Sequence, residues 1–185
     1  MKIYLLRAQE TIWQQQGLLV GAASVALSER GRSDGDALAT FFDHVKLAAV
    51  YTSPVEQARE TTERVTRKQY EIQDAPLLYD QCFGRLDGQS YAEFQREERR
   101  QRALWEGARN DFIIKDGDRD SIAESYEQMR SRVIRNFREI IEQHSNLDKL
   151  LLVSHNGPIT VITNENLFLN IKREAKGLEI VTYQK

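Results

Sequence analysis

The sequence has few of the residues that form covalent or metal crosslinks. Its 185 residues include one cysteine, Cys82, and three histidines, His44, His144 and His155. A single cysteine excludes an internal disulfide and suits a reducing compartment, and lone cysteines are usually packing groups rather than reactive thiols. Because the three histidines lie far apart in the chain, we expect no metal site.

The sequence also lacks a strong charge of either sign and a long apolar run. It has 26 basic and 28 acidic side chains, for a formal net charge of -2, so we expect no nucleic-acid partner. The basic segment 96–102 is interrupted by Glu97 and Glu98, which favours a solvated helix face over a polyanion site. No run is long enough to span a membrane and no signal-peptide pattern is present, so we expect a cytoplasmic protein without a membrane partner.

The pattern of apolar residues predicts a single domain over residues 1–185, since this length suits one core. Short apolar runs predict strands at 2–6, 47–51, 76–79, 150–153, 167–171 and 178–183. Amphipathic periodicity predicts helices at 28–44, 53–68, 91–105 and 122–145. The alternation predicts an α/β fold, a three-layer sandwich with a mostly parallel central sheet flanked by helices, closed by a hairpin or edge pair.

Several local patterns refine this prediction. Ser28 is typical of a helix N-cap, and the run from Ser53 to Glu56 resembles a capping box with a proline at the first helical position. The segments 80–90 and 107–121 are expected to be loops, and Phe112 is expected to pack under the second one rather than form a lid. The last long helix is expected to bury Met129, Val133, Phe137, Ile140 and Ile141.

Polar groups follow three of the predicted strands. Arg7 follows the first strand, Ser53 the second, and His155 the strand at 150–153. Ligands of open α/β sheets bind at the carboxyl ends of the strands. An arginine fork binds oxyanions in a bidentate manner, and a helix N-terminus adds a positive dipole end. The three strand ends together therefore predict a site for an anion such as a phosphomonoester.

Five segments, in order along the chain, resemble the conserved blocks of the histidine phosphatase (phosphoglycerate mutase-like) superfamily. They are residues 5–11, similar to a block containing Arg-His-Gly-Glu-Thr, and residues 52–61, 78–88, 124–125 and 152–157. The resemblance implies hydrolysis through a phosphohistidine, with no metal and no cofactor. In that chemistry a covalent step divides the transfer into two easier displacements.

The resemblance also assigns site positions. The nucleophile position is held by Ala8, which has no lone pair and cannot attack phosphorus. His155 matches the histidine that donates to the phosphoryl oxygens, and Asp80 lies where an acid protonates the leaving oxygen. The implied phosphate-binding positions are Arg7, His155, Gln14 and Gln57, the last replacing an arginine.

The vacated nucleophile position has two explanations. Because Gln9, Gln14, Gln57 and Asn156 also depart from the blocks, the sequence favours a native pseudophosphatase that binds a phosphorylated small molecule or a phosphoprotein without turnover. In the alternative, position 8 is a histidine in an active phosphomonoester hydrolase, and this chain carries an inactivating change. A structural or interaction module without an anion site is a third hypothesis. The sequence leaves the ligand and the oligomeric state open.

Overall fold

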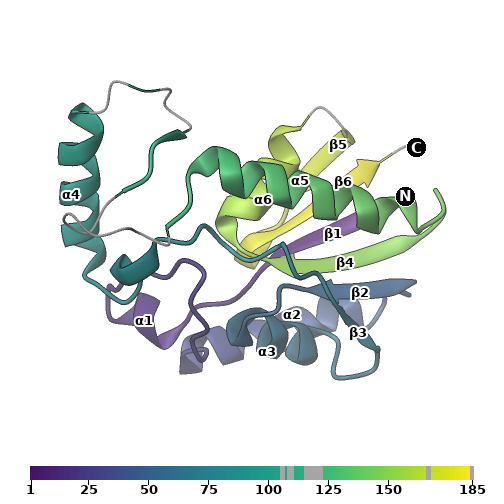
Figure 1. Ribbon diagram of the computed structural model, residues 1–185. Helices are drawn as coiled ribbons and strands as arrows, with labels where there is room; N and C mark the ends of the chain where they lie inside the picture. The colour runs from purple at the N-terminus through teal and green to yellow at the C-terminus, as the bar shows by residue number, and fades with distance from the viewer. Residues whose placement is uncertain (105–106, 108–110, 115–122, 166–167, 184–185) are drawn as a thin grey trace.

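The computed structural model describes residues 1–104, 107, 111–114, 123–165 and 168–183. Its centre is a six-stranded sheet with the order β3-β2-β4-β1-β6-β5 (Figure 1). Four strands are parallel: β1 (Lys2–Arg7), β2 (Ala49–Thr52), β3 (Ile72–Asp74) and β4 (Lys149–Ser154). The last two, β5 (Phe168–Arg173) and β6 (Leu178–Tyr183), form an antiparallel pair that joins the sheet at β1. The predicted closing pair is confirmed.

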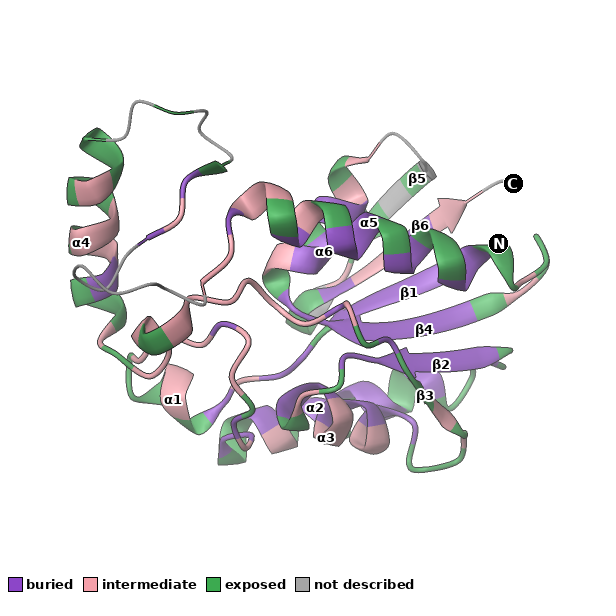
Figure 2. Ribbon diagram, viewed as in Figure 1, coloured by how far each residue is buried: buried purple, intermediate pink, exposed green. Residues whose placement is uncertain are grey.

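Helices cover both faces of this sheet. One face carries α5 (Tyr126–Glu142) and α6 (Asn156–Asn164), and the other carries α2 (Glu29–Phe42) and α3 (Glu56–Val65) (Figures 1 and 2). Alternate residues of β1 belong to different cores, since Leu5 packs with the α5 side and Leu6 with the α2 side. This is the period-two pattern of a strand buried on both faces. The predicted three-layer α/β fold is confirmed.

Helix α4 (Tyr91–Ala103) stands apart from the sheet (Figure 1). It packs instead on a small cluster built from Leu19, Phe94, Phe112 and Ile114. The short elements α1 (Ile12–Gln15), η1 (Gly84–Leu86) and η3 (Ala175–Gly177) complete the described structure. Phe112 is buried, as the sequence analysis favoured. Most of the predicted loop 107–121 lies outside the described residues.

The predicted strand at 76–79 is wrong. The strand that pairs with β2 comes earlier, at Ile72–Asp74, and the Ala75 amide makes the next bond to the Thr52 carbonyl. Pro76 follows and has no N–H to extend the ladder. The chain therefore turns, and the Leu77 amide donates to Asn136 Oδ1 of α5 at 3.3 Å.

The predicted capping box at Ser53 is also wrong. Helix α3 begins at Glu56 after Val55, with no cap from its own segment, and the Glu56 amide donates to Ser24 Oγ at 2.9 Å. The helix ends at Val65, before the predicted position 68, because Arg67 and Lys68 adopt positive φ angles. The helix is thus capped by a loop distant in sequence, which leaves the Ser53 hydroxyl available elsewhere.

Two other helix starts show caps of the expected kind. Ser28 accepts a hydrogen bond from the Gly31 amide at 3.0 Å, which confirms the predicted cap of α2. Helix α5 begins at Tyr126 rather than at 122, because Ser125 and Gln128 form a reciprocal capping box. The five residues predicted to form its buried face are all buried. Among the described helices, none combines the length and apolar character needed to cross a bilayer.

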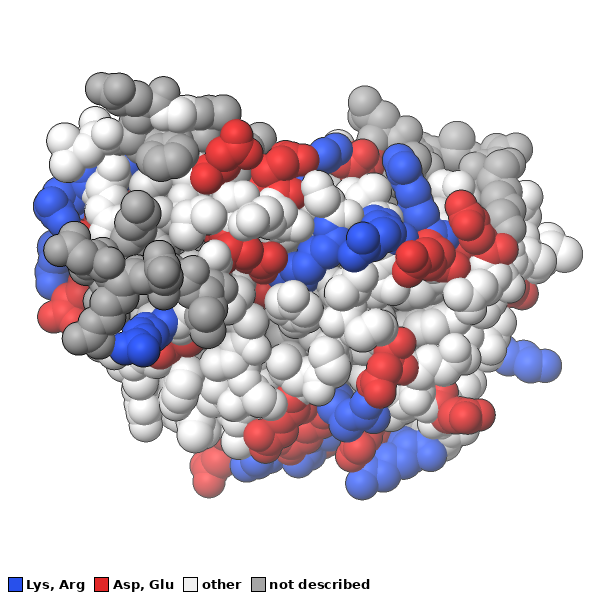
Figure 3. Space-filling view, in the orientation of Figure 1, with Lys and Arg blue, Asp and Glu red and all other residues white. Residues whose placement is uncertain are grey.

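Charged side chains of both signs lie on the face of the molecule shown in Figure 3, where basic groups form a band across the middle and acidic groups lie at its ends. Among the described residues many charged side chains form ion pairs, such as Arg64 with Asp36 and Glu60. Surface pairs of this kind contribute little to stability individually.

Candidate active site

The three strand ends singled out in the sequence meet at one edge of the sheet. The register pairs Arg7 with Ser154 and Thr52 with Val153, so that Arg7, Ser53 and His155 emerge side by side. One recess at this edge is lined by all of the predicted site residues: Arg7, Ala8, Gln14, Gln57, Asp80 and His155. The structure therefore brings together positions that are as far as 148 residues apart in the chain (7 to 155).

Arg7 offers a charged group to this recess. Its side chain is exposed, and no hydrogen bond or ion pair links its guanidinium to another described residue. Its stem rests on Gly177, where an added Cβ would lie 2.9 Å from Arg7 Cβ and where φ is +76°. Glycine is needed at this position for both reasons. The guanidinium is therefore available to an oxyanion, which it can bind with two parallel N–H bonds.

His155 is buried and held by the residue that was predicted to cap α3. Its Nε2 lies 2.9 Å from Ser53 Oγ. Burial, together with the positive charges of Arg7 and Arg132, lowers the pKa of His155 to about 3. The imidazole is therefore neutral at neutral pH. It carries one N–H donor, and the bond with Ser53 influences which ring nitrogen bears it.

Asp80 places a carboxyl group on the opposite wall. The residue as a whole is half-buried, but burial of its carboxyl raises its pKa to about 6, against the hydrogen bond from the Gln81 amide and the charges of Arg7 and Arg132. A Cβ on Gly157 would collide with Asp80 Oδ1, so this glycine lets the carboxyl approach the start of α6. A pKa near 6 suits a group that gives up and takes up a proton near neutral pH.

A buried arginine that the sequence analysis missed holds the Asp80 loop. Arg132 forms a bidentate ion pair with Glu124, and its remaining N–H groups donate to the carbonyls of Leu77, Tyr79 and Asp80 at 2.7, 2.8 and 2.9 Å. All five donors of the guanidinium are thus satisfied. Glu124 also accepts from the Cys82 amide at 3.0 Å.

A sequence signal for this arrangement existed. Arg132 and Asn136 are polar residues spaced by four on the apolar face of α5, and both are buried. Polar groups on a buried face need partners, and here those partners are backbone groups of the 77–80 turn. We name Arg132 and Glu124 together the loop clamp.

Gln57 makes structural contacts at the position where the resemblance implies an arginine. It is 1% exposed; its Oε1 accepts from the Val25 amide at 3.0 Å, and its Nε2 donates to the Ala23 carbonyl at 2.9 Å. Both ends of the amide therefore hold the backbone of the first loop. A role for Gln57 in phosphate binding stays a prediction.

Two further glutamines surround Ala8, which is 7% exposed. Gln14 closes a capping box with Thr11, whose amide donates to Gln14 Oε1 at 2.9 Å, so that Nε2 is the group it can offer to a ligand. Gln9 donates to the carbonyls of Arg7 and Lys176 at 2.9 and 3.2 Å. The surroundings of Ala8 are thus polar.

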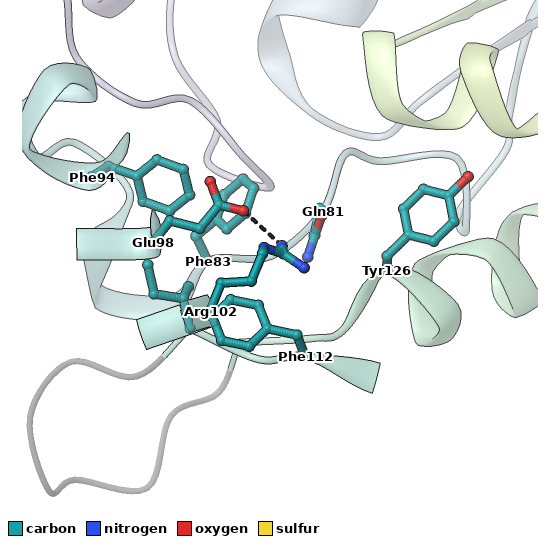
Figure 4. Close-up of a pocket in the computed structure, with 8 residues that line it drawn as sticks. Gln81, Phe83, Phe94, Glu98, Arg102, Phe112 and Tyr126 are labelled. Carbon is teal, nitrogen blue, oxygen red and sulfur yellow. Dashed lines mark hydrogen bonds and ion pairs between the residues drawn. The ribbon is translucent and has the colours of Figure 1, made fainter. Parts of the chain in front are cut away.

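Two larger cavities follow the recess in the direction of α4, the first adjoining the recess and the second adjoining the first. The first, of about 550 Å³, shares Arg7, Gln14, Asp80 and Asn156 with the recess and is otherwise lined mainly by apolar groups such as Leu19. The second, of about 590 Å³, lies beside α4 and is shown in Figure 4. Within the described ranges, no three His, Cys, Asp or Glu side chains are grouped as metal ligands would be.

Comparison with known proteins gives the family. A model of the histidine phosphatase superfamily (branch 1) matches residues 3–176, and the chain belongs to this superfamily. A metal-independent phosphoserine phosphatase of Arabidopsis thaliana is 25% identical over 164 residues, which are 87% of this chain and 66% of that protein. An adenosylcobalamin/α-ribazole phosphatase of Salmonella typhimurium is 26% identical over 163 residues, covering 88% of this chain and 77% of that protein.

Solved structures show the same fold. The α-ribazole phosphatase from Shigella flexneri superposes with a TM-score of 0.77 at 21% identity, covering 100% of this chain and 96% of that one. A phosphoglycerate mutase from Bacillus anthracis superposes with a TM-score of 0.79 at 18% identity, covering 100% of this chain and 92% of that one.

Proposed function

We propose that this member of the histidine phosphatase superfamily is a pseudophosphatase. It binds a phosphorylated small molecule in the strand-end recess and does not turn it over through a phosphohistidine. Arg7 supplies the charged fork, and neutral His155 supplies a hydrogen-bond donor. Ala8 contributes only a methyl group where the family chemistry requires a lone pair. Loss of a covalent nucleophile typically reduces turnover by about 10⁴- to 10⁶-fold.

The observation that carries this proposal is the bonding of Gln57. If Ala8 were a single inactivating change in an enzyme, the remaining phosphate-binding positions would keep their charged groups. Instead, the position of the family's arginine holds a neutral amide whose two ends are bonded to the backbone of Ala23 and Val25. Gln9 is bonded to backbone in the same way. Gln9 and Gln57, which both differ from the family's blocks, therefore have structural roles beside Ala8. This favours a site that lost catalysis as a whole.

The relatives support a small phosphorylated ligand. They are phosphatases named for phosphoserine and for α-ribazole phosphate chemistry, and they match most of this chain. The recess is small and adjoins a cavity of about 550 Å³ with which it shares Arg7 and Asp80. Small-molecule sites are typically concave, with a few placed polar groups on a mainly apolar lining.

The test combines binding and rescue. Calorimetric titration with inorganic phosphate and phosphoserine is expected to detect binding to the starting chain, and hydrolysis of a phosphomonoester panel is expected to stay at background. The variant Ala8→His should gain little activity, because Gln57 leaves the pocket one positive charge short. The double variant Ala8→His with Gln57→Arg should exceed it. Ala8→Asn is the matched control, since it adds a polar group without an imidazole nucleophile.

Each alternative predicts a different result. Strong phosphatase activity and a trapped phosphohistidine in Ala8→His alone would establish the inactivated-enzyme explanation. Absence of any phosphate or phosphoserine binding would instead establish the module without an anion site.

A further inference from the structure

We propose that the ligand of this site is a phosphomonoester that carries a planar aromatic ring, and that the ring lies in the cavity beside α4. This inference rests on the proposed function, because it takes the phosphate to be held at Arg7. We name the second cavity the aromatic chamber; its lining residues are Gln81, Phe83, Phe94, Glu98, Arg102, Phe112, Ile114 and Tyr126.

The aromatic chamber borders the cavity at the phosphate-binding end. The cavity that contains Arg7 and Asp80 shares four residues with the chamber: Gln81, Phe83, Phe94 and Tyr126. Adjacent residues also serve the two ends, since Asp80 lines the recess and Gln81 lines the chamber. A single ligand can therefore place its phosphate at Arg7 and extend its other end toward α4.

The size of the space argues against a very small ligand. The two neighbouring cavities have volumes of about 550 and 590 Å³. Each volume falls within the range of about 300–1,000 Å³ that is usual for sites of drug-sized ligands. A ligand the size of phosphoserine would occupy part of the first cavity and leave the chamber empty.

The chamber is not an ordinary satellite core. Phe94, Phe112 and Ile114 are buried there, at 7, 6 and 4% exposure. The space of about 590 Å³ beside them opens to the surface, since Gln81, Phe83 and Tyr126 of its lining are only half-buried. A ligand from solution can therefore reach these aromatic side chains.

The walls of the chamber suit a flat ring. Phe83 and Phe94 pack edge-to-face with centroids 4.9 Å apart, and the Arg102 guanidinium lies 4.3 Å from the centroid of Phe112. Figure 4 shows these rings around the cavity, with the guanidinium between Phe112 and Glu98. Aromatic pairs gain stabilisation beyond that expected from buried area alone, and a saturated ring of the same size does not.

The edge of the chamber is polar. Glu98 and Arg102 form an ion pair at 2.7 Å, and the Gln81 amide nitrogen donates to the Glu124 carbonyl at 2.9 Å. Polar groups at the rim and aromatic faces on the walls match a ring whose edge carries heteroatoms.

The test compares matched ligands by calorimetry on the full chain. The probes are inorganic phosphate, phenyl phosphate, cyclohexyl phosphate and 2-naphthyl phosphate. We expect phenyl phosphate to bind about 3- to 10-fold more tightly than cyclohexyl phosphate, which has a similar size but no π face. We expect 2-naphthyl phosphate to bind more tightly than phenyl phosphate.

A substitution in the chamber sharpens the test. Phe112→Leu should remove the preference for phenyl over cyclohexyl phosphate and leave the affinity for inorganic phosphate unchanged. Phe41→Leu is the matched control, because Phe41 lies on α2 outside both cavities and is 37% exposed. It should preserve the preference.

The outcomes separate the two proposals. If inorganic phosphate binds but phenyl and cyclohexyl phosphate bind equally, the aromatic ligand is wrong and the proposed function stands. If the preference is present but survives Phe112→Leu, the ring does not lie in the chamber and the inference also fails. If neither inorganic phosphate nor any ester binds, the proposed function fails and the inference fails with it.

Discussion

The strand-end recess and the aromatic chamber are built in different ways. The recess is formed where three parallel strands end, and its residues Arg7 and His155 end or directly follow strands whose positions are fixed by the sheet ladder. The chamber is formed by α4, the segment 111–114 and the loop after Asp80, none of which belongs to the sheet. Under the two proposals above, the sheet would position the group that binds phosphate, and the peripheral elements would select what is attached to it.

The loop clamp connects the two regions. Arg132 binds the carbonyl of Asp80, which faces the recess, while the Glu124 backbone carbonyl accepts from the side chain of Gln81, which faces the chamber. The two residues of the loop clamp therefore contact both the Asp80 wall of the recess and the Gln81 wall of the chamber. Substitutions in this ion pair, in the recess and in the chamber test whether the two regions have different roles.

The largest effect is expected from removing the clamp. Arg132→Ala leaves Glu124, which is 14% exposed, without its partner, and breaking a buried pair in this way typically costs about 3–5 kcal/mol. Urea unfolding should show this loss, and binding of both phosphate and aromatic esters should weaken together. Arg130→Ala is the control on the same helix, since its pairs with Glu127 and Glu165 are 40% exposed on the arginine side. It should cost less than about 1 kcal/mol. Equal costs would contradict the clamp.

A second test separates phosphate binding from stability. Arg7→Ala should weaken phosphate binding about 10- to 100-fold, as expected for loss of a charge-assisted hydrogen bond. The unfolding midpoint should barely change, because Arg7 is exposed and its guanidinium forms no hydrogen bond or ion pair with another described residue. The control Arg59→Ala removes a surface arginine paired with Asp74, away from the recess. Calorimetry on both variants checks this, and a similar loss in Arg59→Ala would point to a nonspecific charge effect.

A third test concerns the buried histidine. The pKa of His155 is lowered to about 3 from an unfolded value near 6.5, so the unfolded chain takes up a proton between these values and the native chain does not. The contribution of this group to stability is therefore full above pH 6.5 and declines as the pH falls toward 3. The decline is about 1.4 kcal/mol per unit, or about 2 kcal/mol between pH 7 and pH 5.

The variant His155→Asn isolates that contribution. Asp80 and Asp87 have pKa values raised to about 6 by burial, so they favour the native state as the pH falls and oppose the histidine. Between pH 7 and pH 5 the variant should therefore gain stability relative to the starting chain, as measured by urea unfolding at each pH. Parallel pH profiles would show that His155 has the same pKa in the native and unfolded chains, which would contradict the lowered value.

The smallest expected effect is a pH dependence at the recess. Sulfate keeps its charge between pH 7 and pH 5, whereas Asp80 becomes neutral as the pH falls through about 6. Sulfate binding should therefore tighten about 3- to 10-fold over this range, since a negative charge near the anion is removed. Asp80→Asn should bind sulfate tightly at both pH values. A residual dependence in that variant would belong to Asp87, whose carboxyl accepts from the Gly21 amide at 2.9 Å.

Local sequence patterns predicted the elements that form without help from distant residues. The apolar runs at β1 and β4, the Ser28 cap, the buried face of α5 and the closing pair β5–β6 were all predicted correctly. In each case the signal lies within a few residues, as a run, a cap or a period. The sequence also predicted that Arg7, Ser53 and His155 lie together, because the carboxyl ends of parallel strands meet at one edge of a sheet.

Tertiary structure decided which polar groups remain for a ligand. Ser53 was predicted to cap α3, but Ser24 caps that helix and Ser53 contacts His155. The amide of Gln57, a predicted phosphate-binding position, is also bonded to the backbone of the first loop. These outcomes depend on partners that arrive from distant segments, and no local pattern encodes them. The sequence alone determined the scaffold and the absence of a nucleophile at position 8. Only folding determined the charge state of His155 and Asp80 and the form of the chamber, because desolvation and cavity shape arise from residues that meet only in three dimensions.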